Sequence, residues 1–186
     1  MTQENATTLL QRFNETIRQW IACLDDYTLE MLHQQPAGNS WSLGQVYIHL
    51  LDDTGWFAGQ MKAALADTEN STGEMHENAR SIFRNNGFPD VLIQGPSTNI
   101  AMRQPKSKME LSQGLGSILA DVNALYATVD ASRSTGKTRH PGLLFFSSLE
   151  WLQFAEMHLR HHLRQKQRID EQLFPGISSS RGMTIR

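Results

Sequence analysis

Apolar residues recur at intervals of three and four along the first part of the chain, from about Asn5 to about His33. The stripe that they form consists of Leu9, Leu10, Phe13, Ile17, Trp20, Ile21, Leu24 and Leu32. This spacing places the apolar side chains on one face of an α-helix. We therefore predict one amphipathic helix, which ends at Pro36 and Gly38 in "QQPAGNS" because both residues break helices.

Three later stretches repeat this pattern, and each opens with a capping box. In this motif a serine hydroxyl and a Gln or Glu three residues later satisfy free backbone N–H groups at the start of a helix. The pairs are Ser42 and Gln45, Ser107 and Glu110, and Ser147 and Glu150. From these starts we predict a second helix that fades in "DTENSTG", a third that continues to about residue 129, and a fourth that ends at about residue 173.

A long connection, residues 70–106, separates the second helix from the third. Its segment "GFPDVLIQGPSTNIAMRQP" holds three prolines and several turn residues, so we predict a packed connection with short helical or extended pieces. Only "DVLIQ" in it is a candidate strand, and "ASRSTGKTRHPG" before the fourth helix is predicted to be a polar connection. Gly114 and Gly116 weaken the third helix and are explained if another helix approaches closely there.

Together these elements predict an all-α fold, a four-helix bundle with a long connection between the second and third helices. We expect a single domain over residues 1–174, followed by a flexible C-terminal tail over residues 175–186, where Pro175 and Gly176 stop the last helix.

Charge and cysteine content restrict the function. Seventeen Lys and Arg against nineteen Asp and Glu leave a formal net charge of −2, which argues against nucleic acid as a partner. No apolar run is long enough to span a membrane or to serve as a signal peptide. The single cysteine, Cys23, lies in an apolar helical stretch and is expected to be a small buried residue. We therefore expect a soluble, cytoplasmic protein without disulfides.

The segment "HLRHHLRQK", residues 158–166, concentrates histidines on the fourth helix. His158 and His162 stand four residues apart, about 40° around the helix axis, so both imidazoles can reach one ion. His161 lies on the other side of His158 and is less suited to share that ion. A solvated basic face is the alternative interpretation of this segment, because arginines and a lysine surround the histidines.

The candidate third ligand is His49, which lies on the apolar stripe of the second helix and is therefore expected to point into the bundle. Bundle proteins build metal sites from such facing helices, although a single histidine of this kind is more often an ordinary core residue. Three imidazoles suit zinc, nickel, iron or copper alike, so the ligand type does not select the metal.

Two segments, "WSLGQVYIHLLDDTGWF" and "EWLQFAEMHLRHHLRQKQRID", resemble the DinB-like (DinB/YfiT-like) superfamily of metal-binding four-helix bundles. The family pattern is a tryptophan and a Gly-Gln pair before a histidine on the second helix, with His-x-x-His-His and a following Gln on the fourth. These positions are Trp41, Gly44, Gln45, His49, His158, His161, His162 and Gln165. The likeness covers the second and fourth helices and the order of all four, and says little about residues 70–106.

This resemblance implies a divalent ion, usually zinc or nickel, held by His49, His158 and His162, with open positions for water or substrate. Family members of known activity include thiol S-transferases that use low-molecular-weight thiols, and isomerases that act on thiol adducts. The resemblance therefore favours a metal-dependent enzyme that activates water or such a thiol, a hydrolase or a thiol S-transferase. A homodimer is expected.

Other polar residues are candidates to support the ligands, because a ligating imidazole usually donates its second N–H to an acceptor. Asp52, Asp53, Glu156 and Gln165 are these candidates, and either aspartate is also a candidate base. The alternative for each is an ordinary solvated side chain. Three further histidines are expected to be exposed, and one of them, beside Pro141, is a candidate for the mouth of the site: His33, His76 and His140.

Two other functions remain open from the sequence. One is a non-catalytic, metal-stabilised bundle that serves as a binding or stress-response module. The other is nucleic-acid binding through the basic end of the fourth helix, against which the near-neutral charge counts. A saturated ion would favour the structural role, and an ion that opens onto a pocket would favour catalysis.

Overall fold

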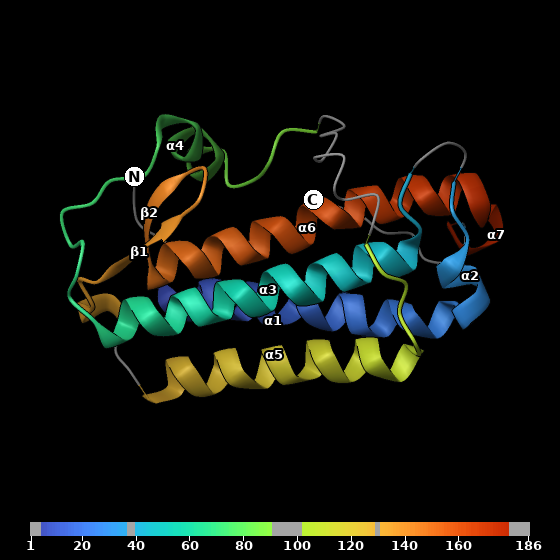
Figure 1. The fold of residues 1–186 in the computed structure, drawn as a ribbon, viewed down its shortest axis with the longest axis horizontal. Coiled ribbons are helices and arrows are strands. Elements are labelled where there is room, and N and C mark those ends of the chain that lie inside the picture. The colour runs from blue at the N-terminus through green and yellow to red at the C-terminus, as the bar shows by residue number, and fades with distance from the viewer. Residues whose placement is uncertain (1–4, 37–39, 91–101, 129–130, 179–186) are drawn as a thin grey trace.

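The computed structural model describes residues 5–36, 40–90, 102–128 and 131–178. Four long helices lie side by side along one axis, α1 (Ala6–Cys23), α3 (Leu43–Ala66), α5 (Lys108–Thr128) and α6 (Ser148–Leu173). In Figure 1, α6 and α5 lie on opposite sides of the pair formed by α1 and α3. This arrangement is the predicted all-α bundle, and the crossover between the second and third long helices is the predicted long connection.

The first predicted helix, from about Asn5 to about His33, is interrupted at residues 24–28. The chain leaves α1 after Cys23, passes through a short 3-10 turn, η1 (Leu24–Asp26), and starts a new helix, α2 (Leu29–His33). Tyr27 between them is extended and buried, and its hydroxyl donates to Asp170 Oδ1 at 2.8 Å. Thr28 then caps α2 through its side chain. The break lets Tyr27 reach a partner that is distant in sequence, which the local apolar spacing does not reveal.

Two of the three predicted capping boxes are complete. Ser42 and Gln45 at the start of α3, and Ser147 and Glu150 at the start of α6, each exchange both hydrogen bonds. At α5 the Ser107 hydroxyl accepts from Glu110 N at 3.0 Å, but the Glu110 carboxylate instead accepts from Lys106 N at 2.7 Å. The three helix starts predicted at serines are therefore confirmed. At α5, however, the glutamate accepts from the backbone N–H of Lys106 and not from that of Ser107.

The core forms where the apolar stripes of the long helices meet. Its largest fully buried side chains include Trp20, Trp151, Tyr47, Phe13, Phe146 and Ile17. Cys23 is buried among them, as predicted. Gly114 lies so close to α3 that a Cβ there would meet Leu51 Cδ2 at 2.6 Å, which confirms the close helix approach, whereas Gly116 faces open space. Burial of these apolar stripes is the main force that assembles the four helices.

The connections contain more structure than the sequence indicated. The long crossover includes α4 (Glu77–Arg84), and the polar connection before α6 contains an antiparallel hairpin, β1 (Lys137–His140) and β2 (Leu144–Ser147). Predicting no strand there was wrong, because the hairpin is short and half-buried and is supported by a bridge between Met75 and Leu144. The candidate strand "DVLIQ" lies almost wholly outside the described residues.

A short helix follows the C-terminal end of α6. Helix α6 stops at Leu173, as predicted, and Pro175 begins a one-turn helix, α7 (Pro175–Ser178). A proline is favoured at a first helical position because its missing N–H has no intrahelical role there. Of the helices that the structure describes, none has both the length and the apolar character that a membrane crossing requires.

Candidate metal centre

Three imidazoles from two helices converge at the interface of α3 and α6. The Nε2 atom of His49 lies 3.1 Å from that of His158 and 3.2 Å from that of His162, and the last two atoms are 3.2 Å apart. His158 and His162 are on successive turns of α6, and His49 faces them from α3. The three residues predicted as ligands are therefore brought together, and we call them the histidine cluster.

The spacing of these nitrogens fits a single divalent ion. Nitrogens bound to one ion at ~2.0–2.1 Å stand about 3.3 Å apart in a tetrahedral site and about 2.9 Å apart in an octahedral site. The observed separations of 3.1 to 3.2 Å fall between these values. Three neutral imidazoles are also a donor set that suits a transition metal.

Burial keeps the cluster uncharged. Desolvation lowers the pKa of His49 to about 4 and that of His162 to about 3, and it holds the pKa of His158 well below its usual value. Neighbouring histidines lower these pKa values further. At neutral pH the rings are therefore unprotonated at one nitrogen each, the form that binds a metal.

Gln165 controls the tautomer of one ring. The Nδ1 atom of His162 donates to Gln165 Oε1 at 2.6 Å, so the lone pair of His162 is left on Nε2, the atom that faces the cluster. Gln165 was predicted as a supporting residue, and the structure places it in contact with a cluster histidine. The Nδ1 atom of His158 is buried and has no hydrogen-bond partner.

The two adjacent aspartates differ. Asp53 places one carboxylate oxygen 3.6 Å from His49 Nδ1 and the other 3.7 Å from His158 Nε2. Burial, together with the neighbouring charge of Asp52, raises the pKa of Asp53 to about 6. Asp52 is exposed and touches none of the three histidines in the contacts that the structure describes. Of the two aspartates, Asp53 is the one that lies beside the cluster.

Glu156 does not support the cluster, in contrast to the prediction. It is buried on another face of α6, where it accepts from Arg160 Nε and Nη2 at 3.0 and 2.8 Å. Its closeness to His158 in the sequence does not bring it to the site, because position on the helix circumference decides the contact. His161 likewise faces away, and its Nδ1 accepts from Arg164 at 3.0 Å.

The family assignment rests on a match over most of the chain. The family model described as the DinB superfamily matches residues 12–165, which include the histidine cluster and all four long helices in whole or in part. The chain belongs to the DinB superfamily. Neither the curated proteins nor the solved structures include a significant match to it. The resemblance drawn from the sequence is confirmed at the level of the superfamily.

The Gly-Gln pair that this DinB-superfamily chain carries has a structural role. A Cβ at Gly44 would lie 2.7 Å from Leu32 O and 2.8 Å from Pro105 Cδ, so only glycine fits there. Gln45 donates from Nε2 to Met102 O at 2.6 Å. Both residues therefore fasten the end of the long connection to the start of α3, one turn before His49, and they do not enter the cluster.

A hollow of about 370 Å³ opens beside the cluster of this DinB-superfamily protein. Its lining includes His158 of the cluster and the neighbouring Asp53, and the rest consists of Trp56, Phe57, Phe88, His140, Pro141 and Phe154. His140, which its place before Pro141 made a candidate for the mouth of the site, lines this hollow. The expectation that its side chain is exposed is wrong, because it is half-buried and stacks on Trp151, with ring centroids 5.6 Å apart.

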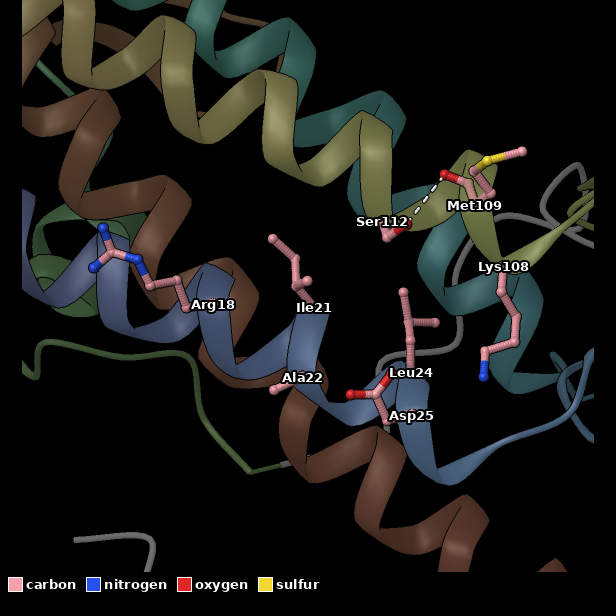
Figure 2. A pocket seen from close by; sticks show the side chains of 8 residues that line it. All are labelled: Arg18, Ile21, Ala22, Leu24, Asp25, Lys108, Met109 and Ser112. Carbon is pink, nitrogen blue, oxygen red and sulfur yellow. Dashed lines mark hydrogen bonds between the residues drawn. The ribbon is translucent and has the colours of Figure 1, made fainter.

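A second hollow, of about 280 Å³, lies between the C-terminal part of α1 and the start of α5 and includes no residue of the cluster (Figure 2). It is lined by Arg18, Ile21, Ala22, Leu24, Asp25, Lys108, Met109 and Ser112. No histidine is among these lining residues.

Sequence reasoning missed the part of the aromatic wall that the long connection supplies. Phe88 belongs to the long connection, where no periodicity marks its partners, yet its ring centroid lies 5.4 Å from that of His161 and 5.3 Å from that of Phe154. The one available signal was the pair His140 and Pro141 before the fourth helix. Neither residue indicated the hairpin that carries His140 to the site.

Proposed function

We propose that the protein is a metal-dependent enzyme, in which a divalent ion on His49, His158 and His162 activates water or a low-molecular-weight thiol. Zinc or nickel is the proposed ion, with iron or another transition metal as the alternative. The observation that carries the proposal is the convergence of three uncharged Nε2 atoms next to a hollow that can admit a substrate.

When bound, such an ion would supply Lewis acidity and lower the pKa of a water or a thiol to near neutrality. The protein's own groups would do the remaining work. Gln165 orients His162, and Asp53 offers a carboxylate whose pKa of about 6 suits a proton acceptor near neutral pH. Aromatic side chains line the proposed substrate side. Hydrolysis and thiol transfer both use these parts.

The hollow favours catalysis over a purely structural metal site. Structural zinc sites are closed by four protein ligands, whereas catalytic sites keep a position for water or substrate. The cluster offers three histidines and opens beside an aromatic-lined space. A non-catalytic, metal-stabilised binding module would not need that space.

Metal content on untagged protein tests the site. We expect about one ion per chain in the wild type, and loss of that ion in His158→Ala. His161→Ala is the matched control, because it removes a neighbouring histidine that contacts Arg164 outside the cluster. Retention of the ion in His158→Ala, or its loss in His161→Ala alone, would disprove the proposed ligand set.

Activity is tested by incubating the zinc- and nickel-loaded protein with panels of thiols, electrophiles and hydrolysable esters. Asp53→Asn is expected to lower turnover by about 10²–10⁴-fold while the metal content is retained, as loss of a general base does. Asp52→Asn is the matched control and should leave turnover unchanged. Full metal loading without turnover in any panel would favour the non-catalytic module.

We further propose that residues 1–174 form a single domain and that the protein is a cytoplasmic homodimer. The buried lone cysteine fits a reducing compartment. The exposed Met109, beside the hollow between α1 and α5, offers an apolar surface for a second copy. Light scattering should give twice the mass of the chain, and Met109→Glu should halve it. A monomeric wild type would refute the dimer.

A further inference from the structure

We propose that the hollow beside the histidine cluster binds the uncharged, ring-containing body of the substrate, while the reacting group of that substrate faces the cluster. This inference rests on the proposed function, since it names the class of molecule that the enzyme would take. Binding of such a ligand by the walls of the hollow can be measured with or without a metal ion.

Flat apolar surfaces make up most of the lining. Trp56, Phe57, Phe88 and Phe154 contribute aromatic rings, to which the His140 ring and Pro141 are added. Trp56 is 41% exposed although it is a large apolar side chain, so its surface is available to a ligand. Aromatic side chains favour partners that stack with an offset or meet them edge to face. A planar ring system is the shape that this lining accommodates best.

The lining lacks any positive side chain. No lysine or arginine is among the residues that border the hollow in the described parts of the chain, so a ligand with an anionic body would be desolvated without a counter-charge. The one carboxylate, Asp53, lies within 3.7 Å of His49 and His158 and therefore belongs to the cluster end. The far walls are uncharged, which matches an uncharged body.

Two arginines of α6 contact the segment that carries Phe88. Arg160 Nη2 donates to Asn86 O at 2.9 Å, and Arg164 Nη2 donates to Phe88 O at 2.9 Å. Arg164 Nε also lies 3.4 Å from Asp90 Oδ1. These contacts hold the segment whose Phe88 ring lines the hollow, and the charges of Arg160 and Arg164 face backbone and carboxylate oxygens of that segment.

Two matched ligands test the charge argument. We would measure the binding of 2-naphthol and of 6-hydroxynaphthalene-2-sulfonate by isothermal titration calorimetry, on the full chain with zinc and after removal of metal. Both compounds present the same hydroxyl, and the sulfonate places a negative charge on the opposite end of the ring. We expect 2-naphthol to bind at least tenfold more tightly in both states. Equal binding, or tighter binding of the sulfonate, would overturn the inference.

Variants locate the binding. Trp56→Ala and Phe88→Ala should each weaken the binding of 2-naphthol at least tenfold, because each removes a wall of the hollow. Met109→Ala is the matched control, as it removes an exposed apolar side chain at the other hollow, and it should leave the binding of 2-naphthol unchanged. Binding that survives both wall variants, or that is lost in Met109→Ala, would place the ligand elsewhere and overturn the inference.

The outcome is separable from that of the proposed function. If the chain takes up no metal but 2-naphthol binds with the expected preference, the metal centre fails and the ligand class stands. If one ion binds to the cluster but neither naphthalene compound binds at the hollow, the metal centre stands and the ligand class fails.

Discussion

Helix α6 contributes to two buried clusters of polar side chains, which differ in whether their polar atoms have hydrogen-bond or ionic partners. At the histidine cluster three Nε2 atoms crowd together, and the His158 Nδ1 atom has no partner. Toward the C-terminal end, Lys166 Nζ donates to Asp170 Oδ2 at 2.6 Å, and Tyr27 donates to Asp170 Oδ1. We call these last three residues the ion-pair cluster.

The difference between the clusters separates structure from function. Every charge of the ion-pair cluster faces an opposite charge or a hydrogen-bond donor, and Lys166 also lies over the Tyr27 ring, 5.3 Å from its centroid. This cluster is complete within the chain. Buried polar groups normally have hydrogen-bond or ionic partners within the protein. The three converging imidazole nitrogens instead fit a site for a metal ion.

The largest effect is expected from breaking the ion-pair cluster. Asp170→Ala leaves Lys166 buried and unpaired, which should lower the free energy of unfolding by about 3–5 kcal/mol. In metal-free protein His158→Leu should cost less than about 1 kcal/mol, because it removes a poorly satisfied polar group. Urea unfolding of both variants measures the contrast. Similar losses in the two variants would show that the clusters do not differ as described.

The second effect concerns pH in the metal-free protein. The pKa values of His49 and His162 fall to about 4 and 3 on folding, so the unfolded chain binds more protons below its histidine pKa of about 6.5. Their stabilising contribution is complete above pH 6.5 and decreases as the pH falls toward 4. By pH 5 the two histidines together should lower the free energy of unfolding by roughly 4 kcal/mol, as an upper value.

The raised pKa of Asp53 opposes this loss, because a carboxyl group whose pKa rises on folding stabilises the fold as the pH drops. Unfolding measured from pH 7.5 to 5 for the wild type and for His49→Gln/His162→Gln isolates the histidine contribution. The double variant should show a flatter profile. Identical profiles would mean that the cluster histidines are not held neutral by burial.

The smallest effect should come from the residue that orients His162. Gln165→Leu removes the acceptor at 2.6 Å from His162 Nδ1 and should weaken zinc binding by about 10–100-fold, with little change in stability. Gln167→Leu is the matched control, since Gln167 is exposed and pairs with Glu171. Competition with a chelator of known affinity measures both. Equal zinc affinity in the two variants would remove Gln165 from the proposed site.

Local patterns in the sequence predicted much of the fold. The starts of α3 and α6 were predictable because capping boxes act within one turn of helix, and the pairing of His158 with His162 was predictable because four residues make one turn. The break between α1 and α2 was not, because Tyr27 leaves the helix to reach Asp170, which is 143 residues away. The hairpin that carries His140 was also missed, because its strands are too short for a clear alternation.

The sequence by itself determined the four helices, their apolar faces, the candidate ligands and the superfamily to which they point, since each depends on spacing within a helix or on a short motif. Only the tertiary structure decided which polar neighbours act together. It placed Asp53 and Gln165 at the cluster, turned Asp52, Glu156 and His161 away, and brought Phe88 from the long connection to the hollow beside the cluster. Such selections depend on packing between segments distant in sequence, which no local pattern encodes.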